Sequence, residues 1–185
     1  MASPIVAEET PNPLALRIST GKPILGQPGW LEFTDLSQAH NSPLAERMLF
    51  FKFVDRIFLS ESFFTLIRKP EYEWEMIIEE IREAVDLFLN SGLPATHDVP
   101  HSDLIIENSH ETRLTELLTF GIRQATLGDG GILIFDRIEN GTLWLNALGA
   151  CAGCPHLSET IGKGIEPVFL REFNFIHQVK VNSPG

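Results

Sequence analysis

The stretch Thr142-Leu-Trp-Leu-Asn-Ala-Leu-Gly-Ala-Cys-Ala-Gly-Cys-Pro155 predicts the local order of elements around which the second half of the chain is built. Its first part has the composition of a strand, and its second part holds the only two cysteines in the chain, Cys151 and Cys154. Pro155 stands where the first residue of a helix is expected, and apolar residues recur after it at helical spacing. The expected order is therefore strand, Cys-x-x-Cys loop and helix.

The two cysteines can bind a metal centre together, but they supply half of the ligands of a tetrahedral or cluster site. From the residues alone three readings stay open: a redox dithiol, a zinc site completed by His156, or a site completed by a second copy of the chain. In a reducing compartment this spacing favours metal or redox chemistry over a structural disulfide. The glycines on both sides of the pair, and the helix start behind it, predict an exposed loop.

Around this stretch the pattern predicts a hairpin and two helices. Strands at 132–138 and 142–148 are joined by Glu139-Asn-Gly141, a strong signal for a type I′ turn. A helix capped by Asn108 is expected before the hairpin, and Pro167 is expected to end or kink the helix that follows the cysteines. A last strand is expected near 175–181. The predicted apolar face of the first helix comprises Leu114, Leu117, Leu118, Ile122 and Ala125.

The N-terminal half predicts a sheet with two helices. Ser42 and Pro43 form a helix start, because serine caps and proline suits the first helical position. The apolar runs 54–59 and 63–68 predict a hairpin, and shorter strands are expected at 14–18 and 30–33. A long amphipathic helix follows, with an apolar stripe and an acidic outer face. Its stripe is formed by Trp74, Ile77, Ile78, Ile81, Val85 and Phe88, and its acidic residues are Glu73, Glu75, Glu79, Glu80, Glu83 and Asp86.

A Gly- and Pro-containing segment without helical or strand period begins at Gly92 and predicts a linker. The expected boundaries are 1–92 for the first domain, 93–108 for the linker and 109–185 for the second domain. The predicted fold class is α+β. It consists of two small α/β domains joined by a flexible linker, and the second carries the Cys-x-x-Cys loop between a β-hairpin and a helix.

The charge composition of the chain argues against two classes of binding partner. The net charge is −11, from 14 basic and 25 acidic residues, so we expect neither nucleic-acid nor membrane binding. The first residues lack the features of a secretory signal or an intact transit peptide. A cytoplasmic location in a bacterium is expected, or the mitochondrial matrix for a processed organellar form.

The sequence contains no recognisable catalytic motif that pairs a nucleophile with a base, so we do not expect an enzyme.

Several of these motifs together resemble a known family. Asp129-Gly-Gly131, the Asn140-Gly141 turn, the cysteine loop and Gly164-Ile-Glu166 resemble the C-terminal domain of the NifU family of iron–sulfur cluster scaffolds. The N-terminal half, with Glu9-Thr-Pro-Asn-Pro13, resembles the domain that precedes it in Nfu-type proteins. The resemblance implies a protein that assembles or carries a [4Fe-4S] cluster, with [2Fe-2S] as the alternative. It implies delivery to acceptor apoproteins, contact with upstream iron–sulfur assembly proteins, and Cys151 and Cys154 as the ligands.

A [4Fe-4S] cluster is normally held by four thiolates, and one chain supplies two. The expected holo form is therefore a homodimer bridged by one cluster. The alternatives are a thiol–disulfide oxidoreductase that uses the same two cysteines, and a zinc-binding module that adds His156.

Overall fold

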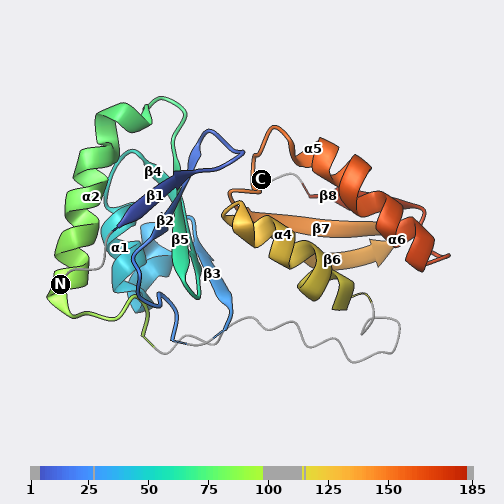
Figure 1. The fold of residues 1–185 in the computed structure, drawn as a ribbon, viewed down its shortest axis with the longest axis horizontal. Coiled ribbons are helices and arrows are strands. Elements are labelled where there is room, and N and C mark those ends of the chain that lie inside the picture. Colours follow the sequence, from blue (N-terminus) through green and yellow to red (C-terminus); the bar gives the residue numbers. More distant parts are fainter. Residues whose placement is uncertain (1–4, 27, 98–113, 115, 183–185) are drawn as a thin grey trace. The chain divides into compact units, whose positions relative to one another are not determined.

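The computed structural model describes residues 5–26, 28–97, 114 and 116–182, except for the side chains of 119–121 and 123–125. The chain divides into two compact units, of which the second contains Pro11–Pro13 together with the residues from Leu104 onward. Each unit has its own sheet and helices (Figure 1), so the protein is a mixed α+β protein, as predicted. Most of the predicted linker, with Asn108, lies outside the described residues.

The first unit is built on a five-stranded antiparallel sheet with the order β1-β2-β5-β4-β3. The predicted hairpin is present as the central pair, and the two shorter predicted strands are also present. A further strand at the edge, β1, was not predicted, because three of its four side chains are exposed and no alternation marks it. The strands are β1 (Val6–Glu9), β2 (Ala15–Ser19), β3 (Trp30–Phe33), β4 (Val54–Ser60) and β5 (Phe63–Arg68).

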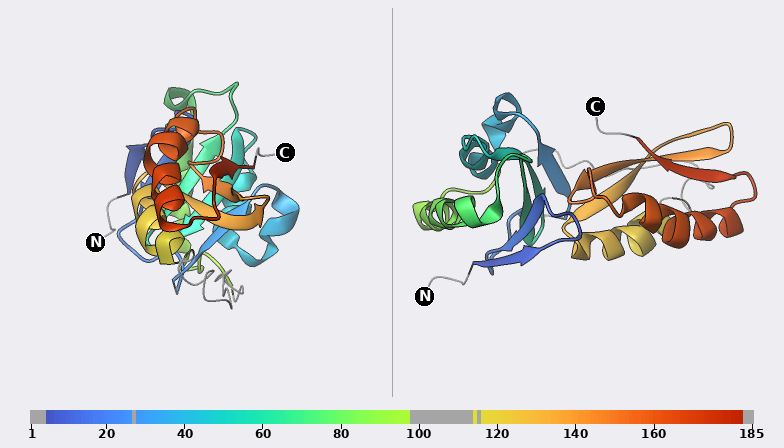
Figure 2. Two further views of the ribbon diagram at one scale, coloured as in Figure 1. Left: turned by 90° about the vertical axis from the view of Figure 1, so that its right-hand side faces the viewer. Right: turned by 90° about the horizontal axis from the view of Figure 1, so that it is seen from above.

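Two α-helices, α1 (Pro43–Leu49) and α2 (Trp74–Ser91), pack on one side of this sheet (Figures 1 and 2). A short 3-10 helix, η1 (Leu36–Asn41), precedes α1. The backbone N–H of Ala45 donates to Ser42 Oγ at 3.1 Å, which confirms the predicted cap. Helix α2 buries five residues of its apolar side and exposes its acidic residues, as its pattern predicts. The buried residues are Ile77, Ile81, Ala84, Val85 and Phe88.

The second unit has a three-stranded sheet with the order β6-β7-β8, formed by β6 (Gly131–Glu139), β7 (Thr142–Gly149) and β8 (Gln178–Val181). Strands β6 and β7 are an antiparallel hairpin, whereas β8 lies parallel to β7. Asn140 and Gly141 both have positive φ values, of 50° and 74°, which confirms the predicted type I′ geometry.

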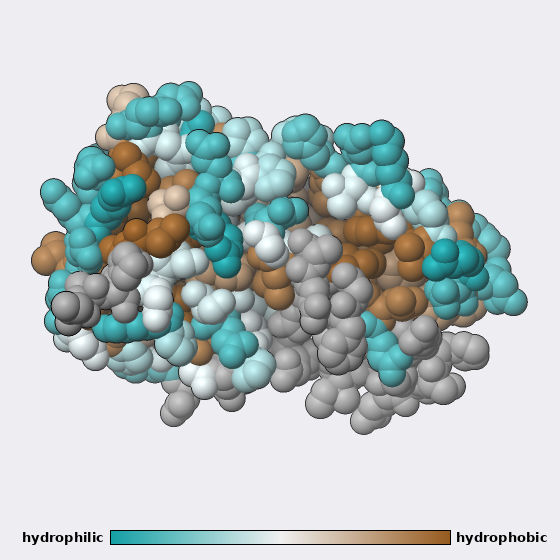
Figure 3. All heavy atoms as spheres, viewed as in Figure 1, coloured by the Kyte–Doolittle hydropathy of each residue, from teal (hydrophilic) through white to brown (hydrophobic). Residues whose placement is uncertain are grey.

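The helices of the second unit cover one face of this sheet, which Figure 2 shows in its right-hand view. A π-helix, η2 (Leu117–Ile122), leads into α4 (Arg123–Gly128) before the hairpin. After the cysteines a continuous helical segment runs through α5 (Leu157–Glu159), the π-helix η3 (Thr160–Ile165) and α6 (Glu166–Glu172). Figure 3 shows hydrophilic side chains on the outer side of this segment and apolar ones beside it. The buried apolar core includes Leu114, Leu118, Leu133, Leu143, Leu145, Ile161, Ile165 and Phe169.

Three details differ from the sequence predictions. Pro155 lies in a turn, and the helix begins two residues later at Leu157. Pro167 does not end the helix, because it falls in the first turn of α6, a position where proline is tolerated. The last strand begins at Gln178 rather than at Phe175, since the preceding residues make the turn back from α6.

Within the described part of the chain, none of the helices combines the length and apolar composition that crossing a bilayer would require.

Candidate metal centre

The two cysteines lie in the segment that connects β7 to α5, and neither forms a disulfide. Short backbone hydrogen bonds curl this segment: Cys151 N–H donates to the carbonyl of Leu148 at 3.3 Å, and Cys154 N–H donates to the carbonyl of Cys151 at 3.2 Å. The N–H of Leu157, the first residue of α5, then donates to the carbonyl of Cys154 at 3.2 Å. Each cysteine therefore sits in a tight turn whose backbone is held on both sides.

The two thiols differ in depth. Cys151 is 8% exposed and packs with the apolar core of the second unit, whereas Cys154 is half-buried. The predicted exposure of the loop therefore holds for Gly153 and in part for Cys154, and it is wrong for Cys151. The reason is the turn at Gly149, with a φ of 60°, which folds the chain back against the core directly after β7.

A glycine of β6 lies directly beneath this turn. Gly131 is the strand partner of Gly149, and a Cβ atom on Gly131 would lie 2.5 Å from Cys151 N and 2.6 Å from the Leu148 carbonyl oxygen. Its neighbour Gly130 accepts a hydrogen bond from Ala150 N–H at 3.1 Å. The sequence marked these glycines as part of a family motif, but it did not predict their contact with the cysteine turn.

A residue from far away in the sequence also holds the turn. Asn12, which belongs to the second unit with Pro11 and Pro13, donates from Nδ2 to the carbonyl oxygens of Ala150 at 3.0 Å and Ala152 at 3.2 Å. Its side chain is 1% exposed. These carbonyls lie on either side of Cys151. No local pattern could have predicted this contact, although Asn12 stands within the Glu9–Pro13 motif.

Two hollows adjoin the cysteines. A cavity of about 80 Å³ is lined by both thiols and by polar residues from other parts of the unit, namely Asn12, Thr126, Asp129, His156 and Thr160. A more open groove of about 450 Å³ lies on the other side of Cys154 and is lined by Gly153, Leu157, Ser158, Ile161 and Gly162. Cys154 therefore borders open space on the outer side of the loop.

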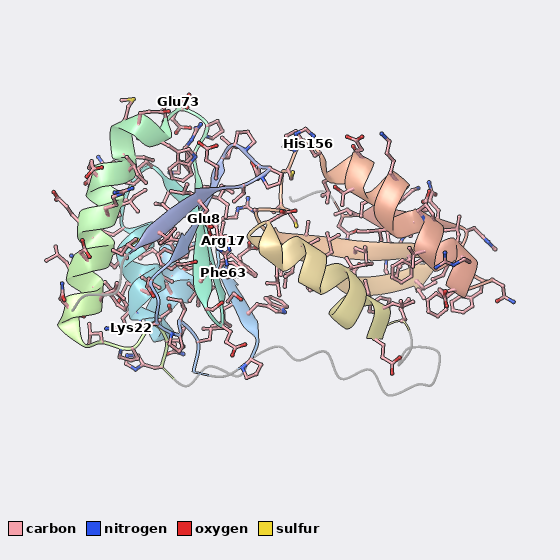
Figure 4. All side chains as sticks on the ribbon, viewed as in Figure 1. Glu8, Arg17, Lys22, Phe63, Glu73 and His156 are labelled. Atoms are coloured by element: carbon pink, nitrogen blue, oxygen red, sulfur yellow. The ribbon has the colours of Figure 1, made fainter. Side chains whose placement is uncertain are left out.

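The residues that the structure describes give no complete metal site within one chain. Among the described residues, no group of three or more His, Cys, Asp or Glu side chains is placed to hold a metal ion. His156 lies in the segment that leads into α5 (Figure 4), and it is exposed. The zinc reading, which needs His156 beside both sulfur atoms, therefore gains no support from this geometry.

Two family models match the chain. The description of the first is "Scaffold protein Nfu/NifU N terminal", over residues 5–92, and that of the second is "NifU-like domain", over residues 115–180. The chain belongs to the NifU/Nfu family of iron–sulfur cluster scaffolds. The second match contains both cysteines, every element from η2 to α6, and β8 up to Lys180.

Two relatives align with nearly the whole of this NifU/Nfu-type chain. The chain is 32% identical over 182 residues to a protein of Drosophila virilis named "NFU1 iron-sulfur cluster scaffold homolog, mitochondrial", and 31% identical to the protein of that name in Drosophila persimilis. These alignments cover 95% of this chain but 61% and 64% of the relatives' lengths. A solution structure of a NifU-like protein from Saccharomyces cerevisiae is 20% identical, with a TM-score of 0.45 over 53% of this chain and 87% of that one.

Proposed function

We propose that this chain carries a [4Fe-4S] cluster as its cargo, bound by Cys151 and Cys154 and bridged between two copies of the chain, and delivers it to acceptor apoproteins. Family membership supports the iron–sulfur role. The observation that carries the finer proposal is the cysteine turn itself. It offers two thiols that form no disulfide, separated by two residues in sequence directly after β7, and no third ligand joins them in the described part of the chain.

Ligand number supports the bridged form. Iron in such clusters prefers thiolate ligands, and four of them complete a [4Fe-4S] cluster. Two chains supply four thiolates, with one half-buried sulfur on each chain next to open space. A site opened by the separation of two chains suits a carrier that releases its cargo. A [2Fe-2S] cluster has the same ligand number and is the alternative cargo.

The apo protein is expected to be a monomer at low salt. Each chain carries a net charge of −11, and this repulsion opposes pairing unless the cluster links the chains. The proposed partners are acceptor apoproteins and upstream iron–sulfur assembly proteins, and the proposed role is not enzymatic. Because the relatives are named mitochondrial, a mitochondrial matrix location is proposed for an organellar form, and the cytoplasm for a bacterial one. The boundaries 1–92, 93–108 and 109–185 stay our proposal for the domains.

Anaerobic reconstitution with iron and sulfide tests this proposal. The wild-type chain is expected to gain the charge-transfer absorbance of a cluster, to approach two irons per chain and to elute as a dimer. Chelation of the iron should return it to monomers. A loaded protein that elutes as a monomer with a full cluster, and without an added small thiol, contradicts the bridged form.

Matched variants separate the alternatives. Cys151→Ser and Cys154→Ser should each abolish loading, because a hydroxyl is a poor ligand for iron in place of a thiolate. His156→Ala should load like wild type, and loss of metal in that variant as complete as in Cys151→Ser would favour zinc. Reduction of a model disulfide by the metal-free protein would instead favour the oxidoreductase.

A further inference from the structure

We propose that Asn12 is a positioning residue for the cluster, because its side-chain amide holds the backbone on both sides of Cys151. The inference rests on the proposed function, since the cargo it concerns is the cluster held by Cys151 and Cys154.

The chemistry of the contact determines how the Asn12 amide is oriented. The oxygens of Ala150 and Ala152 are carbonyls and can only accept hydrogen bonds, so the group that faces them must be the NH₂ of the amide. That NH₂ has two hydrogens, and the two contacts, at 3.0 and 3.2 Å, use both of them. A side chain without a donor at this position cannot replace either bond.

The other hydrogen bonds of the turn are local. The carbonyls of Leu148, Gly149 and Cys151 each accept from an N–H group three residues further along the same turn. The carbonyls of Ala150 and Ala152 alternate with them and are instead held by a residue 138 and 140 positions away. Asn12 therefore links the turn to a segment outside it and is not replaceable by a small shift within the loop.

The position of these two carbonyls gives the contact its consequence for binding. The carbonyl of Ala152 belongs to the stretch between the two cysteines, so rotation of that peptide changes the separation of the two sulfur atoms. The carbonyl of Ala150 immediately precedes Cys151. Hydrogen bonds to Asn12 keep both peptides from rotating. They also keep the two carbonyl oxygens, which carry partial negative charge, directed at the amide donor and not at a thiolate.

Burial strengthens the effect. Asn12 is 1% exposed, and Ala150 and Ala152 are 3% and 5% exposed. Water has little access to replace a lost donor there, so removal of the amide leaves the two carbonyls to find new partners by moving. The turn that carries Cys151 is what moves. Cys154, which lies beyond these carbonyls and is already half-buried, is affected less.

The test uses the full chain with Asn12→Leu, which keeps the number and branching of the side-chain heavy atoms and removes the donor. Asn12→Ser is the second variant, in case the first does not fold. Thr10→Ala is the matched control, because Thr10 lies two residues away and its Oγ1 donates to the carbonyl of Ala15 in the first unit. All variants are compared with wild type by circular dichroism before use.

The first measurement is the alkylation rate of each cysteine in the metal-free, reduced protein, resolved by mass spectrometry. Cys154 serves as the reference within the same molecule. We expect the ratio of Cys151 to Cys154 alkylation to rise about tenfold in Asn12→Leu, the factor that corresponds to about 1.4 kcal/mol. Thr10→Ala should keep the wild-type ratio. General destabilisation would also raise this ratio, because Cys151 is buried and Cys154 is half-buried, so Gly141→Ala, which strains the far end of the β6–β7 hairpin, is the second control. A ratio in Asn12→Leu no higher than in Gly141→Ala would overturn the proposal.

The second measurement is the loss of iron from the reconstituted protein to a chelator, followed by absorbance. Asn12→Leu should load but release iron about tenfold faster than wild type, with an altered electron paramagnetic resonance spectrum of the reduced cluster. If Asn12→Leu releases iron at the wild-type rate and gives the wild-type spectrum, Asn12 does not position the cluster. This result would overturn the proposal for the cluster even if the alkylation ratio rises. If wild type itself does not load, the proposed function fails, and the alkylation ratio alone then decides whether Asn12 positions the turn.

Discussion

The substitution Gly131→Ala tests whether the cysteine turn depends on the close approach of β6. Gly131 does not have a positive φ, so alanine is conformationally permitted there and only space opposes it. The added Cβ would lie 2.5 Å from Cys151 N, 2.6 Å from the Leu148 carbonyl oxygen and 2.9 Å from Ala150 N. All three are backbone atoms, so no side-chain rotation relieves the collision.

The size of the effect follows from these distances. The closest pair would lie about 0.9 Å inside ordinary contact, and overpacking of this kind costs about 1–3 kcal/mol. Displacement of the turn also weakens the hydrogen bond from Ala150 N–H to the Gly130 carbonyl. Loss of this hydrogen bond adds about 1 kcal/mol to the destabilisation. We therefore expect Gly131→Ala to lower the free energy of unfolding of the second unit by about 2–4 kcal/mol.

Native-state hydrogen exchange read by mass spectrometry measures this loss by segment. Peptides from β6 and β7 should exchange about 30- to 700-fold faster where they open by unfolding of the unit. Peptides from β4 and β5 of the first unit should be unchanged and serve as the internal reference. Loading with iron and sulfide should fall in the same variant, since the turn that presents Cys151 is displaced.

Gly128→Ala is the matched control. It lies three residues earlier at the end of α4, a Cβ there meets nothing within 4 Å, and its φ is not positive. The free energy of unfolding of the Gly128→Ala variant should stay within about 1 kcal/mol of the wild-type value. Exchange in Gly131→Ala that equals exchange in Gly128→Ala would refute the close approach as the cause.

Three further outcomes are expected. Gly141→Ala should cost about 1–3 kcal/mol in thermal denaturation, because its φ is 74° and the added Cβ would lie 2.7 Å from the His177 ring. Ser42→Ala should cost about 1–2 kcal/mol in urea denaturation, since the buried hydroxyl caps α1 and donates to a carbonyl at 2.8 Å. The pKa of Asp136 lies below its ordinary value, chiefly because Asn182 donates to it at 3.0 Å, so Asn182→Ala should raise that pKa in an NMR titration. Because the folded-state pKa is the lower one, the stabilisation is present above the unfolded pKa and is lost as pH falls through the folded value.

Elements that depend on neighbours in sequence could be predicted well. The stripe of α2, the cap at Ser42 and the type I′ turn at Asn140-Gly141 each need residues only a few positions apart, and all three are confirmed. The exposed edge strand β1 carries too little apolar pattern to be found. Pro167 does not end the helix, because the effect of a proline depends on where in a helix it falls, and the sequence pattern did not place the first turn of α6 there.

The candidate site shows the same division. The two cysteines and their family motif were visible in the sequence, because the chemistry of thiolates and their spacing are local properties. Their unequal depth was not visible, since burial of Cys151 depends on how the turn at Gly149 folds the chain back against the core of the second unit.

The parallel pairing of β8 with β7, the approach of Gly131 to Cys151 and the hydrogen bonds from Asn12 were decided by tertiary structure alone. Each joins residues that are separated by about twenty to more than a hundred positions. Such partners are selected when a whole unit packs its core and satisfies its buried carbonyls, and no short-range pattern records that choice.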